Sequence, residues 1–117
     1  LNRHRETLVL RHVAWMDAFR HQLRTIKTWE HRGERYDRLR VNVPERNEEL
    51  SQVLNATLSA TERDEVLSKI NPAAHLLANQ SRHLRDLREN RLIDGFSHME
   101  LQKILLELMA QQGKAAP

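Results

Sequence analysis

The chain has 117 residues, of which 39% are hydrophobic and 30% are charged. This is enough for one domain with a single core and too apolar for a disordered segment. The chain has no cysteine, which excludes a disulfide framework and a thiolate metal site. It has only three glycines and three prolines, which disfavours a fold of strands and turns. Charge is uneven, because residues 1–40 carry ten Lys or Arg against five Asp or Glu, whereas residues 41–72 carry three against six.

The first long helix is predicted from Glu6 to Thr28, where apolar residues recur at helical spacing. Its predicted main stripe consists of Val9, Val13, Met16, Leu23 and Ile26. A second apolar face carries Leu8, Trp15 and Phe19. A helix that is apolar on two faces contacts more than one neighbour. We therefore expect this helix at the centre of a bundle or against another subunit.

Residues 29–44 are predicted to form an irregular connection. Gly33 can end a helix, and Val43 is disfavoured in the helical region because Pro44 follows it. A short helix from Glu45 to Leu58 should come next, since proline is well accepted at a helix start.

Another short helix is predicted from Thr61 to Ile70, with Ser59 or Thr61 as its N-cap. The clearest local signal follows, because Asn71 suits an N-cap and Pro72 suits the first helical position. That helix should run to about Asn90. Its predicted inward residues are Ala73, Leu76, Leu77, Leu84 and Leu87.

The last helix is predicted to begin near Asp94, a suitable cap, and to end near Gly113. Its predicted stripe consists of Leu101, Ile104, Leu105 and Leu108. Together these elements predict an all-α fold, a bundle of about five or six helices with two or three long ones. The whole chain, residues 1–117, should form this single domain.

The sequence carries no pattern typical of a catalytic or metal site, and we expect neither enzyme activity nor a cofactor. No two histidines are four residues apart, whereas His4 and His12 are eight residues apart, as are His75 and His83. That spacing separates two rings by about 12 Å along the axis, which is too far for one metal ion. No serine lies in a Gly-x-Ser-x-Gly turn, and the three glycines are too scattered for a phosphate loop.

The sequence favours neither membrane insertion nor nucleic-acid binding. The longest apolar run is Val13–Met16, far below the roughly 20 residues of a membrane span, and the charged residues 1–15 do not resemble a signal peptide. Arg20, Arg24 and Lys27 could follow a phosphate backbone along one side of the first helix. However, aromatic residues make up only 4% of the chain, which leaves few platforms for stacking bases, so nucleic-acid binding is disfavoured.

Several short sequence words, taken in their order and spacing, resemble the bacterial branch of the bestrophin family of ion channels. They cover most of the chain except about residues 29–60. The words are Arg11-His12-Val13-Ala14-Trp15, Arg20-His21-Gln22-Leu23-Arg24, Asn71-Pro72-Ala73-Ala74-His75-Leu76-Leu77, Leu84-Arg85-Asp86-Leu87-Arg88-Glu89, Leu92-Ile93-Asp94-Gly95-Phe96, Glu100-Leu101-Gln102-Lys103 and Gln111-Gln112-Gly113-Lys114.

The resemblance implies that this segment links the second and third membrane segments on the cytoplasmic face of the cell membrane. Family members form pentamers around one ion-conducting axis, with chloride or other anions as the first candidates to pass. The segment would then form the inner vestibule, and Phe96 falls on the apolar position that narrows its exit. The partners implied are the chain's own copies, the permeating ions and the membrane through the flanking segments.

Alternatives remain open at this point. Phe96 could instead pack as a staple against the preceding element, and Glu100 and Lys103, which could line the vestibule, suit a solvated surface equally well. The chain also departs from the family, because it ends in Ala115-Ala116-Pro117 and lacks both the membrane pore neck and the acidic calcium cluster of animal members. The other functional hypothesis is a soluble helical scaffold or a binding module for nucleic acid or an acidic protein.

Overall fold

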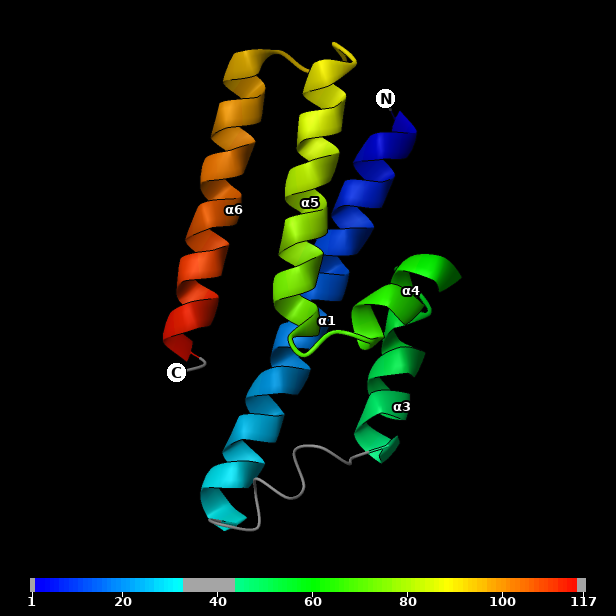
Figure 1. Cartoon of the computed structure of the whole chain (residues 1–117), viewed down its shortest axis with the longest axis vertical. Coiled ribbons are helices and arrows are strands. Elements are labelled where there is room, and N and C mark those ends of the chain that lie inside the picture. The colour runs from blue at the N-terminus through cyan, green and yellow to red at the C-terminus, as the bar shows by residue number, and fades with distance from the viewer. Residues whose placement is uncertain (1, 33–43, 116–117) are drawn as a thin grey trace.

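A central helix, α5 (Pro72–Glu89), organises the fold, because α1, α4 and α6 all pack against it (Figure 1). The computed structural model describes residues 2–32 and 44–115, with the side chains of residues 2–24 and 49–114. The other helices are α1 (Asn2–Arg32), α3 (Pro44–Leu54), α4 (Ala60–Leu67) and α6 (Gly95–Ala115). The predicted all-α bundle is confirmed, with three long and two short helices and no strand among the described residues.

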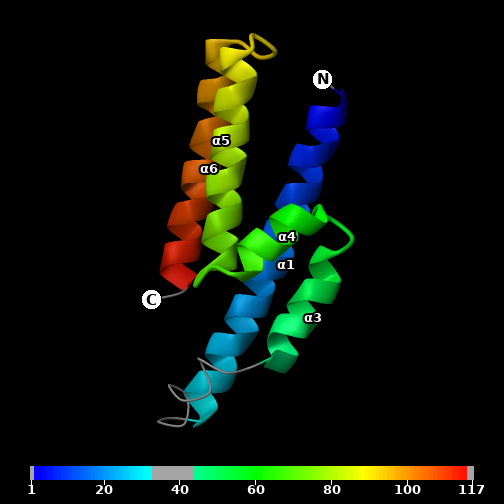
Figure 2. The ribbon, with the colours of Figure 1, turned by 45° about the vertical axis from the view of Figure 1, so that its right-hand side comes forward.

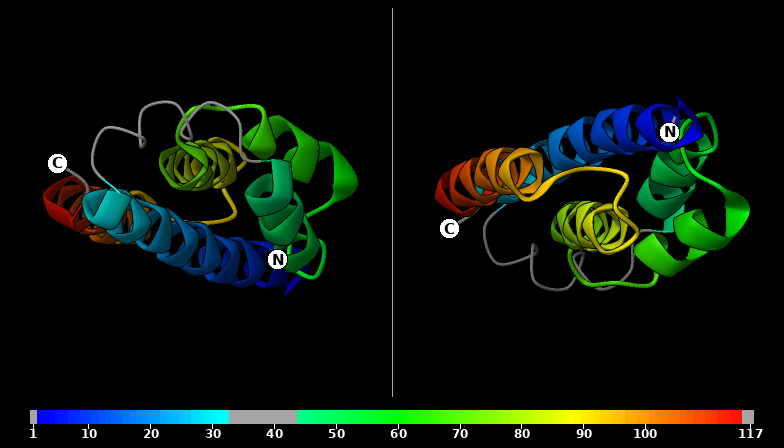
Figure 3. Two further views of the ribbon diagram at one scale, coloured as in Figure 1. Left: turned by 90° about the horizontal axis from the view of Figure 1, so that it is seen from below. Right: turned by 90° about the horizontal axis from the view of Figure 1, so that it is seen from above.

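The arrangement is a thin slab rather than a sphere. Seen end-on, α1 and α6 form one row, and α5 lies on one side of it with α4 next to α5 (Figure 3), while α3 packs against α1 and α4. The second view shows α3 beside the lower half of α1 (Figure 2). The radius of gyration is 15.7 Å, whereas about 13 Å is expected for a compact domain of this length. A thin slab leaves much of each long helix uncovered.

One apolar core joins the helices. It consists of Ala14, Trp15, Ala18, Leu50, Leu54, Leu58, Val66, Ala73, Leu76, Leu77, Leu84, Leu87 and Leu105. The five residues predicted to face inward from α5 are all in it. Helix α5 begins as predicted, because the Asn71 side chain accepts a hydrogen bond from the Ala74 N–H at 3.1 Å and Pro72 occupies its first turn.

Only one of the two apolar faces predicted for α1 is buried. Val9, Val13, Met16 and Leu23 are exposed, whereas Ala14, Trp15 and Ala18 are buried and Leu8 and Phe19 pack against the core. The side chain of Ile26 lies outside the described residues. Two small residues flank Trp15 on the buried side and permit a close approach of helices, so the second predicted face, rather than the row of large aliphatic residues, meets α5 and α3.

Several predicted boundaries need correction. Helix α1 continues through residues 29–32, which were assigned to an irregular connection, because no helix-breaking residue precedes Gly33. Pro44, the last residue of that connection, already belongs to α3. Residues 33–43 lie outside the described part of the chain.

The short helices end earlier than predicted, α3 at Leu54 and α4 at Leu67. Ser59, not Thr61, caps α4 by accepting the Glu62 N–H at 3.3 Å. Helix α6 runs through Gly113 to Ala115 instead of stopping there, since Gly113 does not adopt the positive φ that ends a helix.

Two of the four residues in the predicted apolar stripe of α6 do not face the core. Leu105 is buried and Leu108 packs against the core, but Leu101 and Ile104 are exposed. Helix α6 has α5 as its main neighbour, so only a narrow strip of its circumference is covered. Residues on the flank of that strip therefore stay in contact with water.

The turn between α5 and α6 contains a strained residue. Arg91 has a φ of 60°, in the left-handed region that favours glycine. Its N–H donates to the Arg88 carbonyl at 3.0 Å, and the N–H of Leu92 donates to the Leu87 carbonyl at 2.9 Å. These two bonds define a Schellman motif in which an arginine occupies the usual glycine position.

Replacing this arginine should stabilise the chain. We expect Arg91→Gly to raise the free energy of unfolding by about 1 kcal/mol, because the left-handed conformation costs a non-glycine residue about 1–2 kcal/mol. Urea unfolding followed by circular dichroism measures the change. The matched control is Arg85→Gly, an exposed position inside α5, which should lower the same quantity by about 1 kcal/mol. A loss of similar size at both positions would mean that Arg91 is not strained.

Candidate functional site

The residues predicted to narrow the exit of a vestibule lie on the outer side of α6. Phe96 sits in the first turn of that helix and is 68% exposed. The turn is held by Asp94, whose carboxylate accepts the Ser97 N–H at 2.6 Å. This backbone hydrogen bond is the main reason that the pKa of Asp94 lies below its usual value. With so much of its ring exposed, Phe96 does not act as a staple against the core.

Phe96 begins a row of outward residues on α6. Met99, Lys103 and Leu106 follow it at spacings of three, four and three, which places them on one face, and all four are exposed. Glu100 lies next to this row, and its carboxylate forms an ion pair with the Lys103 ammonium at 3.5 Å. An exposed pair of this kind contributes at most about 1 kcal/mol, so the two side chains are free to respond to a nearby ion.

A second apolar row lies on the outer face of α1. It consists of Val9, Val13, Met16 and Leu23, separated by four, three and seven residues. This is the spacing by which one helix packs against another, and no helix of the described chain covers it. In a chain with 30% charged residues, uncovered rows of large apolar side chains are typical of surfaces that meet other proteins.

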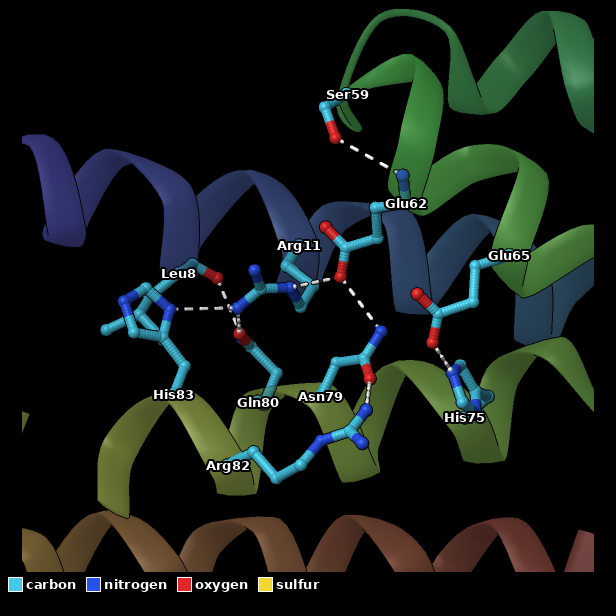
Figure 4. Close-up of polar contacts among 10 residues, drawn as sticks. All are labelled: Leu8, Arg11, Ser59, Glu62, Glu65, His75, Asn79, Gln80, Arg82 and His83. Carbon is cyan, nitrogen blue, oxygen red and sulfur yellow. Dashed lines mark hydrogen bonds and ion pairs between the residues drawn. The ribbon is translucent and has the colours of Figure 1, made fainter. Parts of the chain in front are cut away.

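A partly buried polar network, which we call the polar cluster, joins α1, α4 and α5 (Figure 4). Its members are His4, Arg11, Glu62, Asn79, Gln80 and His83. Arg11 is the hub, since its Nε donates to the Glu62 carboxylate at 2.8 Å and one Nη donates to both Gln80 Oε1 at 2.8 Å and His83 Nδ1 at 3.0 Å. The arginine is therefore bound on two sides, by α4 and by α5.

The remaining bonds of the polar cluster tie these groups to the backbone and to each other. Gln80 Nε2 donates to the Leu8 carbonyl at 2.8 Å, Asn79 Nδ2 donates to the Glu62 carboxylate at 2.9 Å, and a ring nitrogen of His4 lies 2.9 Å from His83 Nε2. A network whose polar groups are paired by hydrogen bonds in this way holds its helices in one relative position.

An open groove of about 420 Å³ lies beside the polar cluster, between α1, α4 and α5. Its lining consists of Arg11, Ser59, Thr61, Glu62, Glu65, Asn79, Arg82, His83 and Asp86. Most of these groups already pair with protein partners: Arg82 donates to the Asn79 side chain, and His75 contacts the Glu65 carboxylate at 2.7 Å. The hydrogen bond from His75 is the main cause of the lowered pKa of Glu65. Most of the hydrogen-bonding groups that line the groove are therefore already engaged within the protein.

The sequence did not reveal the polar cluster, although a signal was present. Arg11 lies on the face of Trp15, Ala18 and Leu8, and Gln80 stands midway between Leu76 and Leu84 on the inward stripe of α5. A polar side chain inside an apolar stripe needs a buried partner. Which residue is that partner, however, depends on which helices pack together. Among the described residues, no group of three or more His, Asp or Glu is placed to hold a metal ion.

Comparison with known proteins adds no assignment: no family model, curated protein or solved structure matches this chain significantly. Within the described residues, none of the helices combines the length and the apolar character needed to cross a membrane.

Proposed function

We propose that this chain is the cytoplasmic helical domain of a bestrophin-like ion channel. Copies of the domain would surround a common axis as a pentamer and form the inner vestibule. Its narrow exit would be a ring of Phe96 side chains. The membrane spans of such a channel would flank this segment. The domain itself would carry out no chemical reaction, and its role would be to pack, to assemble and to shape the ion path.

The exposure of Phe96 is the observation that carries the proposal. A phenylalanine that is 68% exposed at a helix end gains little from burial within its own chain. The same position falls on the family constriction when the sequence words are compared. A ring of such side chains would disfavour hydrated ions, because a narrow apolar passage loses its water.

The rest of the outer faces supports assembly. Glu100 and Lys103 lie one and two turns beyond Phe96 on α6, where a ring of each would place fixed charges next to the ion path. The uncovered apolar row of α1 would pack against a helix of a neighbouring subunit or of the membrane part. Because Lys103 and Glu100 are paired, we expect them to alter conductance more than the sign of the preferred ion.

Phe96→Ala in the full-length channel should change single-channel conductance or ion selectivity, because a smaller side chain widens the exit and relieves its dewetting. Bilayer recordings with bi-ionic reversal potentials measure both quantities. Assembly should be retained, and the free energy of unfolding should stay within about 0.5 kcal/mol of the wild type, as for other exposed positions.

The matched control is Leu101→Ala, which removes an exposed apolar side chain from another face of the same helix and should leave the currents unchanged. Unchanged currents in Phe96→Ala would refute the aperture. A parent gene without apolar spans of about 20 residues on both sides of this segment would refute the channel itself.

A further inference from the structure

The proton positions in the polar cluster follow from its geometry. Arg11 can only donate, so His83 Nδ1, at 3.0 Å from its Nη, must accept and carries no proton. A neutral His83 then has its proton on Nε2, which lies 2.9 Å from His4 Nδ1. That nitrogen of His4 must accept in turn. The chain of hydrogen bonds from Arg11 to His4 therefore exists only while both histidines are neutral.

The surroundings of His83 disfavour its charged form. Burial lowers its pKa most, and the positive charge of Arg11 and the neighbouring His4 on α1 lower it further. Asp86 on α5 and Glu62 on α4 act in the opposite direction but do not outweigh these effects. Since the pKa of a free histidine is about 6.5, His83 is neutral at pH 7.

The contact of His4 with His83 is a main tie between the start of α1 and the rest of the chain. The neighbours Asn2, Arg3, Arg5 and Glu6 are all exposed, so they contribute little packing. The next tie towards the C-terminus is the bond from Gln80 to the Leu8 carbonyl. Ahead of Leu8, whose side chain packs against the core, the start of α1 is therefore tied to α5 by the His4–His83 ring pair, which is continuous with the bond from His83 to Arg11.

We propose that the His4–His83–Arg11 chain is a proton-sensitive latch that holds the beginning of α1 against α5 at neutral pH and releases it on mild acidification. A proton on His83 Nδ1 would remove the acceptor of Arg11 and set two cations against each other. A proton on His4 Nδ1 would remove the acceptor of His83. This inference is independent of the proposed channel function, because it concerns contacts within one chain.

The direction of the pH effect follows from the pKa of His83. In the released state His83 regains a pKa near 6.5, whereas in the latched state its pKa is lower. The released state therefore binds more protons, and acidification from about pH 7 down to the latched pKa favours release. One proton changes the equilibrium by at most about tenfold per pH unit, and below the latched pKa the effect levels off.

Nuclear magnetic resonance on the whole chain tests the latch between pH 5 and 8. The nitrogen shifts of the imidazole rings should report both His4 and His83 as Nε2–H tautomers at pH 8. Amide protection factors, corrected for intrinsic exchange, should fall for residues 6–10 as the pH is lowered, by up to about tenfold per unit. Those of the middle of α6 should fall less.

A pair of variants separates the latch from other histidine effects. His83→Asn keeps an acceptor for Arg11 but cannot take up a proton, so it should remove the pH dependence of the protection factors. His98→Gln, on α6 and outside the polar cluster, should keep it. If His83→Asn folds poorly, the tautomers of His4 and His83 in the wild type still test the proposed latch. A charged His83 or an Nδ1–H tautomer at pH 8, wild-type protection that does not vary with pH, or pH dependence that persists in His83→Asn would overturn the latch.

Discussion

Leu76→Ala is expected to lower the free energy of unfolding by about 2–5 kcal/mol. Leu76 has an exposure of 0%, and it lies on α5, the helix against which α1, α4 and α6 pack. Removing its branched end leaves a cavity that a thin slab of helices has few spare side chains to fill. Urea unfolding at neutral pH, monitored by the helical circular dichroism signal, measures the effect.

Leu106→Ala provides the matched control, because Leu106 lies on α6 and is 55% exposed. We expect it to change the free energy of unfolding by no more than about 0.5 kcal/mol. Comparable losses for the two leucine variants would contradict the assignment of α5 as the centre of the core.

Arg11→Met should be the most damaging polar substitution, with a loss of about 2–4 kcal/mol in the free energy of unfolding. The Glu62 side chain is only 17% exposed, and without the guanidinium its negative charge is left in a poorly hydrated place. Gln80 and His83 would also lose a donor. This expected loss in the free energy of unfolding is smaller than for a fully buried ion pair, because some water still reaches the Glu62 carboxylate.

A double-mutant cycle isolates the charge. Arg11→Met combined with Glu62→Gln should recover a large part of the loss, because the second change removes the unpaired charge. Glu100→Gln breaks the exposed pair with Lys103 and serves as the control, with an effect below about 1 kcal/mol. If the double variant is as unstable as the sum of the single ones, the two side chains are not coupled and the hub role of Arg11 is wrong.

The accuracy of the sequence predictions differed sharply between α5 and α1. For α5, the cap, the first proline and all five inward residues were correct, because a single narrow apolar stripe leaves one way to face the core. For α1, the sequence showed two apolar faces and did not decide which of them the chain itself covers. The structure buries the face with Ala14, Trp15 and Ala18. Periodicity identifies an apolar face but does not say whether it meets the same chain or another one.

The candidate site divides in the same way. Phe96 was named from the sequence through the resemblance to the bestrophin family, and Glu100 and Lys103 because they follow it on the same helix; the structure adds that all three residues are exposed. Their role in a channel stays a prediction. The polar cluster could not be named, because Arg11 is 51 residues from Glu62 and 69 from Gln80 in the chain. No local pattern links residues at such separations.

The amino-acid sequence by itself determined the helical class and the caps at Asn71 and Asp94, since helix propensity and capping act over a few neighbouring residues. The tertiary structure alone decided which face of α1 is buried, where Arg11 finds its partners and which apolar rows remain uncovered. These outcomes depend on how the helices fit together, and burial is a property of that fit rather than of any one segment.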